Sequence, residues 1–545
     1  MSASAAAPDY QALEFEYRPS PDQRAATTAL HPVVVVGAGP VGLSLAIDLA
    51  QRGLKVLLLD NDHKLSSGSR AICFAKRTLE IFDRLGCCDG MVSKGVSWNV
   101  GRVYLKDELV YSFDLLPEEG HQRPAFINLQ QYYVEGLLVE RALALPNIEI
   151  RWKNKVTGLA QGTDAVTLEI DTPDGPYTVS AGHLAACDGS RSALRGLMGL
   201  ETQGRQFRDR FLIADIRMDS VGFPSERRFW FDPPFHPGQS VLLHKQPDGV
   251  WRVDFQLGWD ADPDEERKPE NIMPRVRAVL DSIGAQAVRF EIVWASVYTF
   301  ACQRMQRFRH GRVLFAGDSA HGVSPFGARG ANSGVQDADN LAWKLALVSR
   351  GEAGDALLDS YASEREYAAD ENIRNSTRAT DFITPKSEVS RLFRDAALEL
   401  AREHSFARRI VNSGRLSVPA TLDGSALNTR DVDAFEGAMR PGAAAADAPL
   451  SRHGERSWLL RELASGFTLL VVGPVPAWAA ALPLQALAVG TDGGWQDDSG
   501  CLQRRYDARP GTAYLLRPDQ HVCARWRLPT EAAVRAALAR AMALH

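Results

Sequence analysis

The sequence predicts a mixed α/β chain in which a parallel-sheet domain is interrupted by a second, mixed sheet and followed by a small C-terminal α/β unit. Three observations lead to this fold class. A strand, a glycine-rich turn, a helix and another strand follow one another over residues 33–60. Short alternating strands fill residues 204–300. A buried strand running into a turn at Gly317 and Asp318 then brings the first pattern back.

The elements of the first domain follow from periodicity. The run of valines at 33–36 is bounded by glycine, as in a fully buried strand, and the next residues repeat apolar positions at helical spacing. KVLLLD, ending at Asp60, has the composition of a second buried strand. Helices are expected over about 69–85 and in INLQQYYVEGLLVERALAL, and further strands follow up to the apolar HLAACDG.

Size, charge and cysteine content narrow the class of protein. At roughly 150 residues per domain, 545 residues correspond to about three to four domains. The 62 basic and 67 acidic residues give a net charge of −5, so we expect a small-molecule partner and no nucleic acid. Seven cysteines without any C-x-x-C spacing argue against a disulfide framework and a zinc ribbon. We therefore expect no metal and a cytoplasmic location.

Neither the N-terminus nor the longest uncharged stretch indicates a membrane. The first thirty residues lack the unbroken apolar run of a signal peptide and have the composition of an arm. Residues 466–490 are uncharged, but three prolines interrupt them, so a buried strand and a short helix are expected there. The predicted segments are an N-terminal arm (1–30), the first domain (31–203), the second sheet (204–300), the return of the first domain (301–390), a helical segment and linker (391–450) and a C-terminal domain (451–545).

The glycine-rich turn predicts a dinucleotide site. In G-x-G-x-x-G the first glycine permits a tight turn, the second lets the backbone approach a pyrophosphate, and the third allows close packing of helix and strand. An acid at the end of the second strand suits the hydroxyls of an unphosphorylated ribose, as in NAD or FAD. The residues predicted to contact the dinucleotide are Gly37, Gly39, Pro40, Gly42, Asp60 and Asn61.

Two further motifs help to choose between NAD and FAD. CDGSRSALR, which begins at Cys187, and GRVLFAGDSAH, which contains Gly317 and Asp318, are each a buried strand that runs into an acid and a small residue. An NAD-dependent dehydrogenase would use the glycine-rich turn alone and would leave both motifs unexplained. A flavin-binding redox sensor or scaffold is the non-catalytic alternative.

The three motifs, in this order, resemble the single-component flavin-dependent aromatic hydroxylases, the family of para-hydroxybenzoate hydroxylase, phenol hydroxylase and 3-(3-hydroxyphenyl)propionate hydroxylase. The resemblance covers about residues 31–348. It implies a Rossmann-like FAD-binding domain that is interrupted by a mixed-sheet substrate domain, and it implies a thioredoxin-like C-terminal domain. Cofactor contacts implied by the matching positions are Asp188, Gly317, Asp318, Pro325, Gly330, Ala331 and Asn332.

Two polar residues extend the resemblance. Arg70 matches an arginine that contacts the FAD pyrophosphate in the family, and Gln131 matches a glutamine near the adenosine and ribityl chain. The neighbouring Gln130 is the alternative in register. For both matches the competing interpretation is a solvated polar side chain at a helix start.

The resemblance implies a reaction in which NADH or NADPH reduces FAD, O2 forms a C4a-hydroperoxyflavin, and an oxygen atom passes to a phenolic or other electron-rich ring. The aspartate that helps to ionise the substrate in phenol hydroxylase is replaced here by Ile72. Tyr298 and His244 are therefore the predicted catalytic residues, and His236 is a weaker candidate relay. Tyr298 is equally compatible with core packing.

The second sheet is expected to enclose the aromatic substrate and to exclude water. Alternate residues of its strands should face the flavin, and the candidates are Phe229, Trp230, Phe231, Trp251, Phe255 and Leu257. Trp251 and Phe255 are the positions at which we expect changes to enlarge the pocket. The C-terminal domain lacks the thioredoxin C-x-x-C, which suggests a structural role, and a homodimer is expected.

Overall fold

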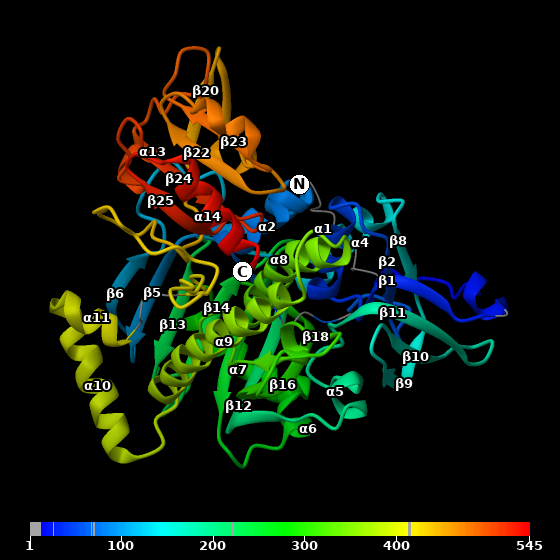
Figure 1. Ribbon diagram of the computed structural model, residues 1–545. Helices are drawn as coiled ribbons and strands as arrows, with labels where there is room; N and C mark the ends of the chain where they lie inside the picture. Colours follow the sequence, from blue (N-terminus) through cyan, green and yellow to red (C-terminus); the bar gives the residue numbers. More distant parts are fainter. Residues whose placement is uncertain are drawn as a thin grey trace.

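The computed structural model describes residues 12–25, 27–66, 68, 71–219, 223–411 and 416–544. Two sheets of eight strands form the body, and a smaller unit of residues 449–541 sits on one side of it (Figure 1). Arg70, one of the predicted FAD contacts, lies outside the described residues.

The first sheet has a parallel core in the order β18-β11-β1-β2-β8, which fits the predicted strand–turn–helix–strand unit. Its apolar strands are buried on both faces, as parallel strands usually are. β17 and the β9–β10 hairpin extend it. The strands are β1 (Ala29–Val36), β2 (Val56–Leu59), β8 (Ile148–Arg151), β9 (Lys155–Gln161), β10 (Val166–Asp171), β11 (Tyr177–Ala186), β17 (Arg309–His310) and β18 (Val313–Phe315).

Helices α1 (Pro40–Gln51), α4 (Gln131–Leu143) and α8 (Gly330–Ser349) pack beside this sheet. The helix expected over 69–85 begins later: residues 73–75 form β3 (Cys73–Ala75), and α2 spans Lys76–Leu85, followed by α3 (Cys88–Lys94). β3 joins β7 (Phe126–Asn128) and β4 (Val96–Trp98) in a small three-stranded sheet.

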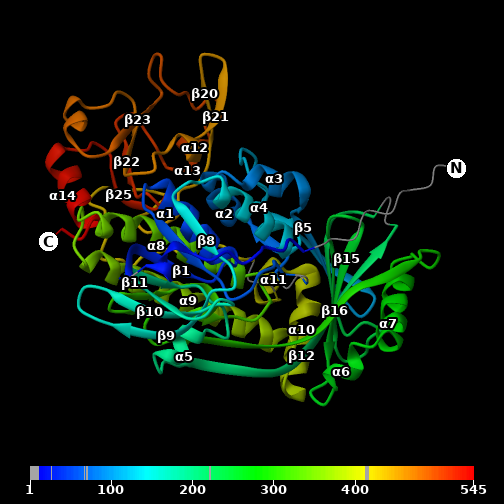
Figure 2. The same cartoon turned by 90° about the vertical axis from the view of Figure 1, so that its right-hand side faces the viewer.

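The second sheet has the order β19-β16-β12-β15-β14-β13-β5-β6. Two of its strands, β5 and β6, belong to the segment 31–203 that was predicted as first domain. They join the second sheet because β5 pairs in parallel with β13 and β6 pairs with β5. Helix α7 (Pro269–Ser282) covers its outer face, beside the short α6 (Pro263–Glu266) (Figure 2). The strands are β5 (Val100–Leu105), β6 (Glu108–Asp114), β12 (Thr202–Met218), β13 (Arg227–Phe231), β14 (Ser240–Lys245), β15 (Val250–Leu257), β16 (Phe290–Met305) and β19 (His321–Gly322).

Three helices follow the return to the first domain. α9 (Ala356–Ile383) runs from beside α8 toward the second sheet, and α10 (Glu388–Glu403) and α11 (Ser405–Val411) lie beside β6.

The C-terminal unit contains a four-stranded sheet in the order β23-β22-β24-β25, with only the β22–β23 pair parallel. Its β22 and η3 (Ala477–Ala481) occupy the uncharged stretch, as predicted, and no helix among the described residues is both long and apolar enough to cross a membrane. Its elements are β20 (Pro449–Arg452), β21 (Glu455–Trp458), α12 (Leu459–Glu462), β22 (Thr468–Val472), β23 (Gln485–Val489), α13 (Cys501–Arg505), β24 (Ala513–Leu516), β25 (Val522–Trp526) and α14 (Glu531–Ala541).

A buried ion network fastens this unit to the body. Arg517 donates to Glu364 of α9 at 2.6 Å, and Lys344 of α8 donates to the same carboxylate at 2.7 Å. Burial alone would raise the pKa of Glu364, but Arg517 and Lys344 hold it far below the usual range. The carboxylate is therefore charged, and loss of either partner would leave an uncompensated buried charge.

Candidate functional site

The glycine-rich turn has the shape that its sequence predicts. Gly37 has φ +106°, and a Cβ there would overlap the carbonyl of Cys187. A Cβ on Gly42 would overlap the carbonyl of Gly37, whereas nothing lies within 4 Å of the Cβ direction of Gly39. Two glycines thus close the turn, and the third leaves open space at the N-terminus of α1, where backbone N–H groups favour phosphate.

Asp60 lies beside this turn at the end of β2. Its Oδ2 accepts from the Ala38 N–H at 2.6 Å, and its Oδ1 accepts from the Asp62 N–H at 2.8 Å. Burial raises its pKa. The carboxylate is therefore fixed beside the turn, and Asn61 next to it is exposed.

The second motif is held in shape by Asp188 and is linked to the third motif by Arg195. Asp188 accepts from the Ser192 hydroxyl at 2.6 Å and from the Leu194 N–H at 3.0 Å, which caps α5 (Ala193–Leu197). Arg195 donates to the carbonyl of Ser319 at 2.8 Å. The carboxylate of Asp188 thus shapes the second motif, and Arg195 ties that motif to the third.

The third motif packs directly on α1. Gly317 has φ +64°, and a Cβ there would lie 2.9 Å from Cγ2 of Val41. A Cβ on Gly334 of α8 would lie 2.6 Å from the same methyl group. Asp318, between these contacts and solvent, is exposed. All three motifs predicted to bind FAD therefore meet around the N-terminus of α1.

A buried triad that the sequence analysis missed holds the third motif in place. Asp337 of α8 accepts from the Gly317 N–H at 2.9 Å, from His321 Nε2 at 2.7 Å and from Arg365 Nε at 2.6 Å. Burial alone would raise the pKa of Asp337, but His321 and Arg365 lower it. The available signal was the closely spaced pair of acids, Asp337 and Asp339, in the middle of α8.

The turn before α8 is joined to the small sheet. Asn332 donates through Nδ2 to the carbonyls of Cys73 at 2.9 Å and Ala328 at 2.6 Å, and its Oδ1 accepts from the Ala75 N–H at 2.8 Å. Its side chain therefore braces the turn. Pro325 is exposed, while Gly330 and Ala331, the first residues of α8, are partly buried.

The two glutamines point in different directions. Gln131 accepts from the Ala71 N–H at 3.3 Å and donates to Glu135 at 2.8 Å, whereas the amide of Gln130 donates to the carbonyl of Pro247 at 3.4 Å. Only Gln131 contacts the segment that follows the predicted pyrophosphate arginine, and this favours it as the family's glutamine.

The expected roles of Trp251 and Phe255 are wrong. Both are buried on the outer face of the second sheet, in the cluster that includes α7. Strand alternation explains this, because Phe229 and Phe231 point inward while Trp230 between them packs with the outer cluster. The sequence showed which strands are aromatic, but not which set of alternate residues on each strand faces inward.

The inner face borders a cavity of about 300 Å³. Phe229 and Phe231 of β13 line it, opposite α9 and α11, and the turn at Phe326 and Gly327 closes one side. This volume fits a small aromatic molecule. No acid is among the described residues that line it, but five arginines are: Arg102, Arg227, Arg329, Arg378 and Arg409.

Tyr298 and His244 lie on the inner face but are not brought together. β12 and β15 separate their strands, and the strand register offsets the two residues by four positions, which places them roughly 20 Å apart at about 4.8 Å per strand and about 3.3 Å per residue. Tyr298 packs partly buried beside Phe300, with ring centroids 5.9 Å apart. His244 is buried beside Trp98, and burial together with Arg227 and Arg252 lowers its pKa well below the usual value. His244 is therefore neutral at physiological pH.

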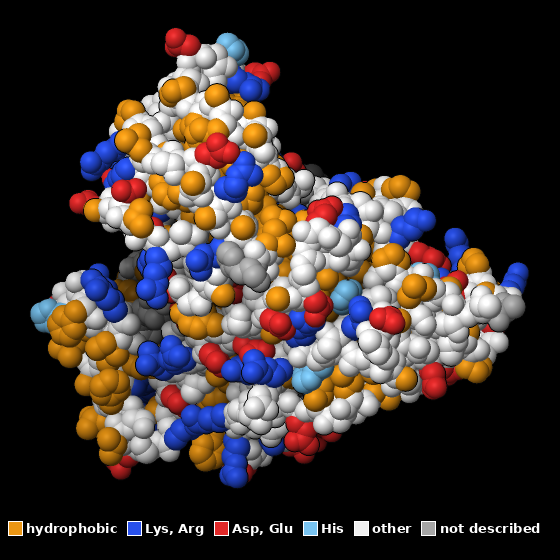
Figure 3. Space-filling view, in the orientation of Figure 1, with side chains coloured by type: hydrophobic (Ala, Val, Ile, Leu, Met, Phe, Trp, Pro, Cys, Tyr) orange, Lys and Arg blue, Asp and Glu red, His pale blue; other side chains and the backbone are white. Residues whose placement is uncertain are grey.

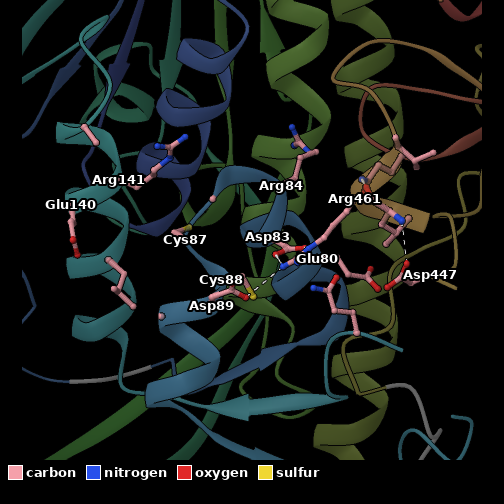
Figure 4. Close-up of a pocket in the computed structure, with 18 residues that line it drawn as sticks. Glu80, Asp83, Arg84, Cys87, Cys88, Asp89, Glu140, Arg141, Asp447 and Arg461 are labelled. Carbon is pink, nitrogen blue, oxygen red and sulfur yellow. Dashed lines mark hydrogen bonds and ion pairs between the residues drawn. The ribbon is translucent and has the colours of Figure 1, made fainter. Parts of the chain in front are cut away.

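A larger cavity of about 640 Å³ separates α2, α3 and α4 from the C-terminal unit (Figure 4). Several of its charged groups already have partners: Arg461 contacts Asp83 at 2.9 Å, and Arg84 contacts Asp48, which lies outside the lining, at 2.7 Å. It fits a junction between two parts of the molecule better than a ligand site. No group of three or more metal-ligating side chains occurs in the described part of the chain.

Comparison with known proteins agrees with this geometry. The family model described as FAD binding domain matches residues 31–376. A 3-(3-hydroxy-phenyl)propionate/3-hydroxycinnamic acid hydroxylase of Mycolicibacterium smegmatis is 28% identical over 516 residues, covering 90% of this chain and 89% of the relative. A protein of the same name from Escherichia coli is 32% identical over 380 residues, covering 69% of this chain and 66% of the relative.

Solved structures show the same fold. A flavin-dependent monooxygenase in complex with FAD and substrate has a TM-score of 0.81 at 24% identity, covering 95% of this chain and 100% of the other. A p-nitrophenol 4-monooxygenase from Pseudomonas putida has a TM-score of 0.63 at 28% identity, covering 72% and 99%. The chain belongs to the FAD-binding-domain family and, within it, to the FAD-dependent aromatic monooxygenases, as the three ordered motifs predict.

Proposed function

We propose that this enzyme hydroxylates a phenolic ring that also carries an acidic group, and that the ring binds in the cavity beside Phe229. The observation that carries the proposal is the lining of that cavity, which combines inward phenylalanines with five arginines and lacks acids among its described residues. Apolar walls suit the ring, and guanidinium groups suit a carboxylate. The names of the relatives, which include propionate and cinnamic acid, agree with such a substrate.

FAD fits the three motifs, because they combine an open turn at Gly39, a helix N-terminus and a carboxylate at Asp60. When bound, FAD supplies redox chemistry: it accepts reducing equivalents from NADH or NADPH and activates O2 for transfer of one oxygen atom to the ring. The residues proposed to hold it are Gly37, Gly39, Pro40, Gly42, Asp60, Asn61, Arg70, Gln131, Asp188, Gly317, Asp318, Pro325, Gly330, Ala331 and Asn332.

The chain's own residues orient the partners and keep water away. The N-terminus of α8 directs its dipole and free N–H groups at the end of the cavity formed by the turn from Pro325 to Gly330, where they stabilise negative charge. Buried Arg329 adds positive charge in the same turn. Phe229, Phe231 and Phe326 shield the reacting atoms from solvent.

Assembly and domain roles extend the proposal. We assign a thioredoxin-like fold to the C-terminal unit, supported by its strand order and by its single parallel pair. Its role is structural, supported by the buried network at Glu364. The chain divides into segments 1–30, 31–203, 204–300, 301–390, 391–450 and 451–545. Strands β5 and β6 lie in the second of these segments but form part of the second sheet.

A homodimer is proposed through α10 and α11, where apolar side chains gather at the lower left of Figure 3. Val389, Leu392 and Phe393 on one side of α10 are 77, 71 and 60% exposed, an unusual density for a monomer surface. A helix stripe can pack on its own copy across a two-fold axis. Sedimentation should therefore give a dimer, and Leu392→Glu should give a monomer; an unchanged dimer in the variant would contradict this interface.

The function is tested with purified protein. It should be yellow with bound flavin, and 3-(3-hydroxyphenyl)propionate or a related phenolic acid should accelerate NAD(P)H oxidation and yield a product with one additional oxygen. Neutral phenols of the same size should bind more weakly, because they lack a carboxylate that can interact with the guanidinium groups of the cavity. Oxidation of NAD(P)H that yields only hydrogen peroxide with every aromatic acid and phenol would contradict the proposal.

A further inference from the structure

The inner face of the second sheet carries buried polar groups that the proposed function has not used. Residues that are opposite each other on neighbouring strands point to the same face of the sheet. In the strand register, His244 is opposite Arg252, and Arg252 is opposite Asp215. Two residues further along β14 and β15, on the same face, Leu242 is opposite Asp254, and Phe229 of β13 is opposite Leu242. Asp254 therefore lies in the same cross-strand row as Phe229, which lines the cavity.

Only part of this polar group is internally paired. Arg252 donates through Nε and Nη2 to the two oxygens of Asp215, each at 2.8 Å, so these charges neutralise each other. Arg227 and Asp254, in contrast, form no hydrogen bond or ion pair with any described residue, although Arg227 Nε and Asp254 Oδ1 are inaccessible to solvent. His244 Nδ1 is equally buried and has no partner in the described part of the chain.

Buried polar atoms without partners are costly and uncommon in folded proteins. An opposite-charge pair would normally close when buried, yet Arg227 and Asp254 stay apart even though their charges influence each other. Arg227 also lines the cavity. Asp254 lies two strands from Phe229, outside the lining of the cavity, and is only partly buried. The arrangement leaves an acceptor and a cation for one ligand group that can give up a proton and then carry a negative charge.

These groups sit next to the predicted cofactor site. Cys73 of β3, whose carbonyl accepts from Asn332, lies close enough to Arg227, Arg252 and Asp254 to be influenced by their charges. The small sheet also contacts the inner face directly, because Asn128 donates to the carbonyl of Lys245 at 2.8 Å. Arg227 and Asp254, which have no partner among the described residues, thus lie between the second sheet and the turn that precedes α8.

We propose that Asp254 takes the proton from the ring hydroxyl of the substrate and that Arg227 holds the resulting phenolate. The O–H bond of the phenol breaks, the proton forms a carboxylic acid at Asp254, and the electron pair stays on the phenolate oxygen beside the guanidinium group. No electron is transferred in this step. The assignment rests on the proposed function, and it supplies the base that is missing at Ile72.

The electrostatics of the site support this role. Burial raises the pKa of Asp254 to about 7, and Asp215 adds to the increase, while Arg252 and Arg227 oppose it. A base works best when its pKa lies near the working pH. His244 and Cys73, the other titratable groups facing Asp254, are both held neutral by burial at that pH.

The first test compares wild type with Asp254→Asn and the conservative Asp254→Glu, with Asp260→Asn on the exposed loop after β15 as the matched control. With 3-(3-hydroxyphenyl)propionate, Asp254→Asn should lose at least about 100-fold in kcat/KM, and Asp254→Glu should recover part of this. A ring-fluorinated analogue that is already ionised at the assay pH should shrink the loss to a few-fold. An equal loss with both phenols, at full FAD content, would overturn the assignment.

The second test needs no substrate. In the infrared difference between the wild-type and Asp254→Asn holoenzymes, a protonated-carboxyl band should be present at pH 6 and should vanish as the pH rises through about 7. Absence of the band at pH 6 would overturn the assignment. If the band behaves as expected but no phenol stimulates the wild type, the proposed function fails while the titration of Asp254 stands, so the two failures are distinguishable.

Discussion

The cofactor region and the inner face of the second sheet differ in what determines their geometry. Around the N-terminus of α1, backbone shape decides: a side chain at Gly37, Gly42 or Gly317 would collide with Cys187, Gly37 or Val41, respectively. On the second sheet, the position of a residue along its strand determines which face its side chain reaches, because successive side chains point to opposite faces. A backbone requirement leaves a glycine in the sequence, whereas an aromatic strand shows no sign of which face lies inward.

The largest expected effect tests the backbone side of this comparison. Gly42→Ala should abolish FAD binding, because the added methyl group would overlap the carbonyl of Gly37. Gly196→Ala in α5, where nothing lies within 4 Å, is the control and should bind FAD normally. Flavin content after purification is the measurement, and a fully loaded Gly42→Ala protein would contradict the role of the turn.

The next effect tests the outer face. Trp251→Ala should lower the free energy of unfolding by ~3–5 kcal/mol, because it leaves a cavity in the cluster under α7. Denaturant unfolding of the holoenzyme measures this. A loss below about 1 kcal/mol would show that Trp251 does not fill the outer core.

The pH dependence of stability tests the environment of Asp254 on the inner face. The folded pKa of Asp254 is about 7, above its ordinary value of 3.8, so the folded state keeps a proton that the unfolded state releases between these values. The stability of wild type relative to Asp254→Asn should therefore fall by a few kcal/mol as the pH rises from about 4 to about 7, and should then level off. A flat difference across this window would contradict the buried position of Asp254.

The smallest effect concerns one cofactor contact. Asp318→Ala should weaken FAD binding by ~1–3 kcal/mol, since it removes an acceptor for the ribityl hydroxyls. Titration of the apoprotein with FAD measures the dissociation constant. An unchanged constant would remove Asp318 from the cofactor site and leave the third motif with a purely structural role.

These contrasts explain what the sequence could and could not predict. The strands, the glycine turns and the convergence of three motifs were predictable, because each depends on local pattern and on the parallel order of β1 and β11. The pairing of β5 with β13 was not, because it joins segments more than 100 residues apart that no shared motif links. The triad at Asp337 and the unpaired Asp254 were also missed, since a buried acid looks like any other acid until its neighbours are known.

The central claim is that the substrate ring lies on the inner, Phe229 side of the second sheet. The most direct test measures hydroxylated product and hydrogen peroxide per NAD(P)H oxidised in Phe229→Leu and Trp251→Phe, two mild changes on opposite faces. We predict that Phe229→Leu diverts a substantial part of the flux to peroxide while Trp251→Phe stays as tightly coupled as wild type. Uncoupling in Trp251→Phe alone, with Phe229→Leu unaffected, would contradict the account.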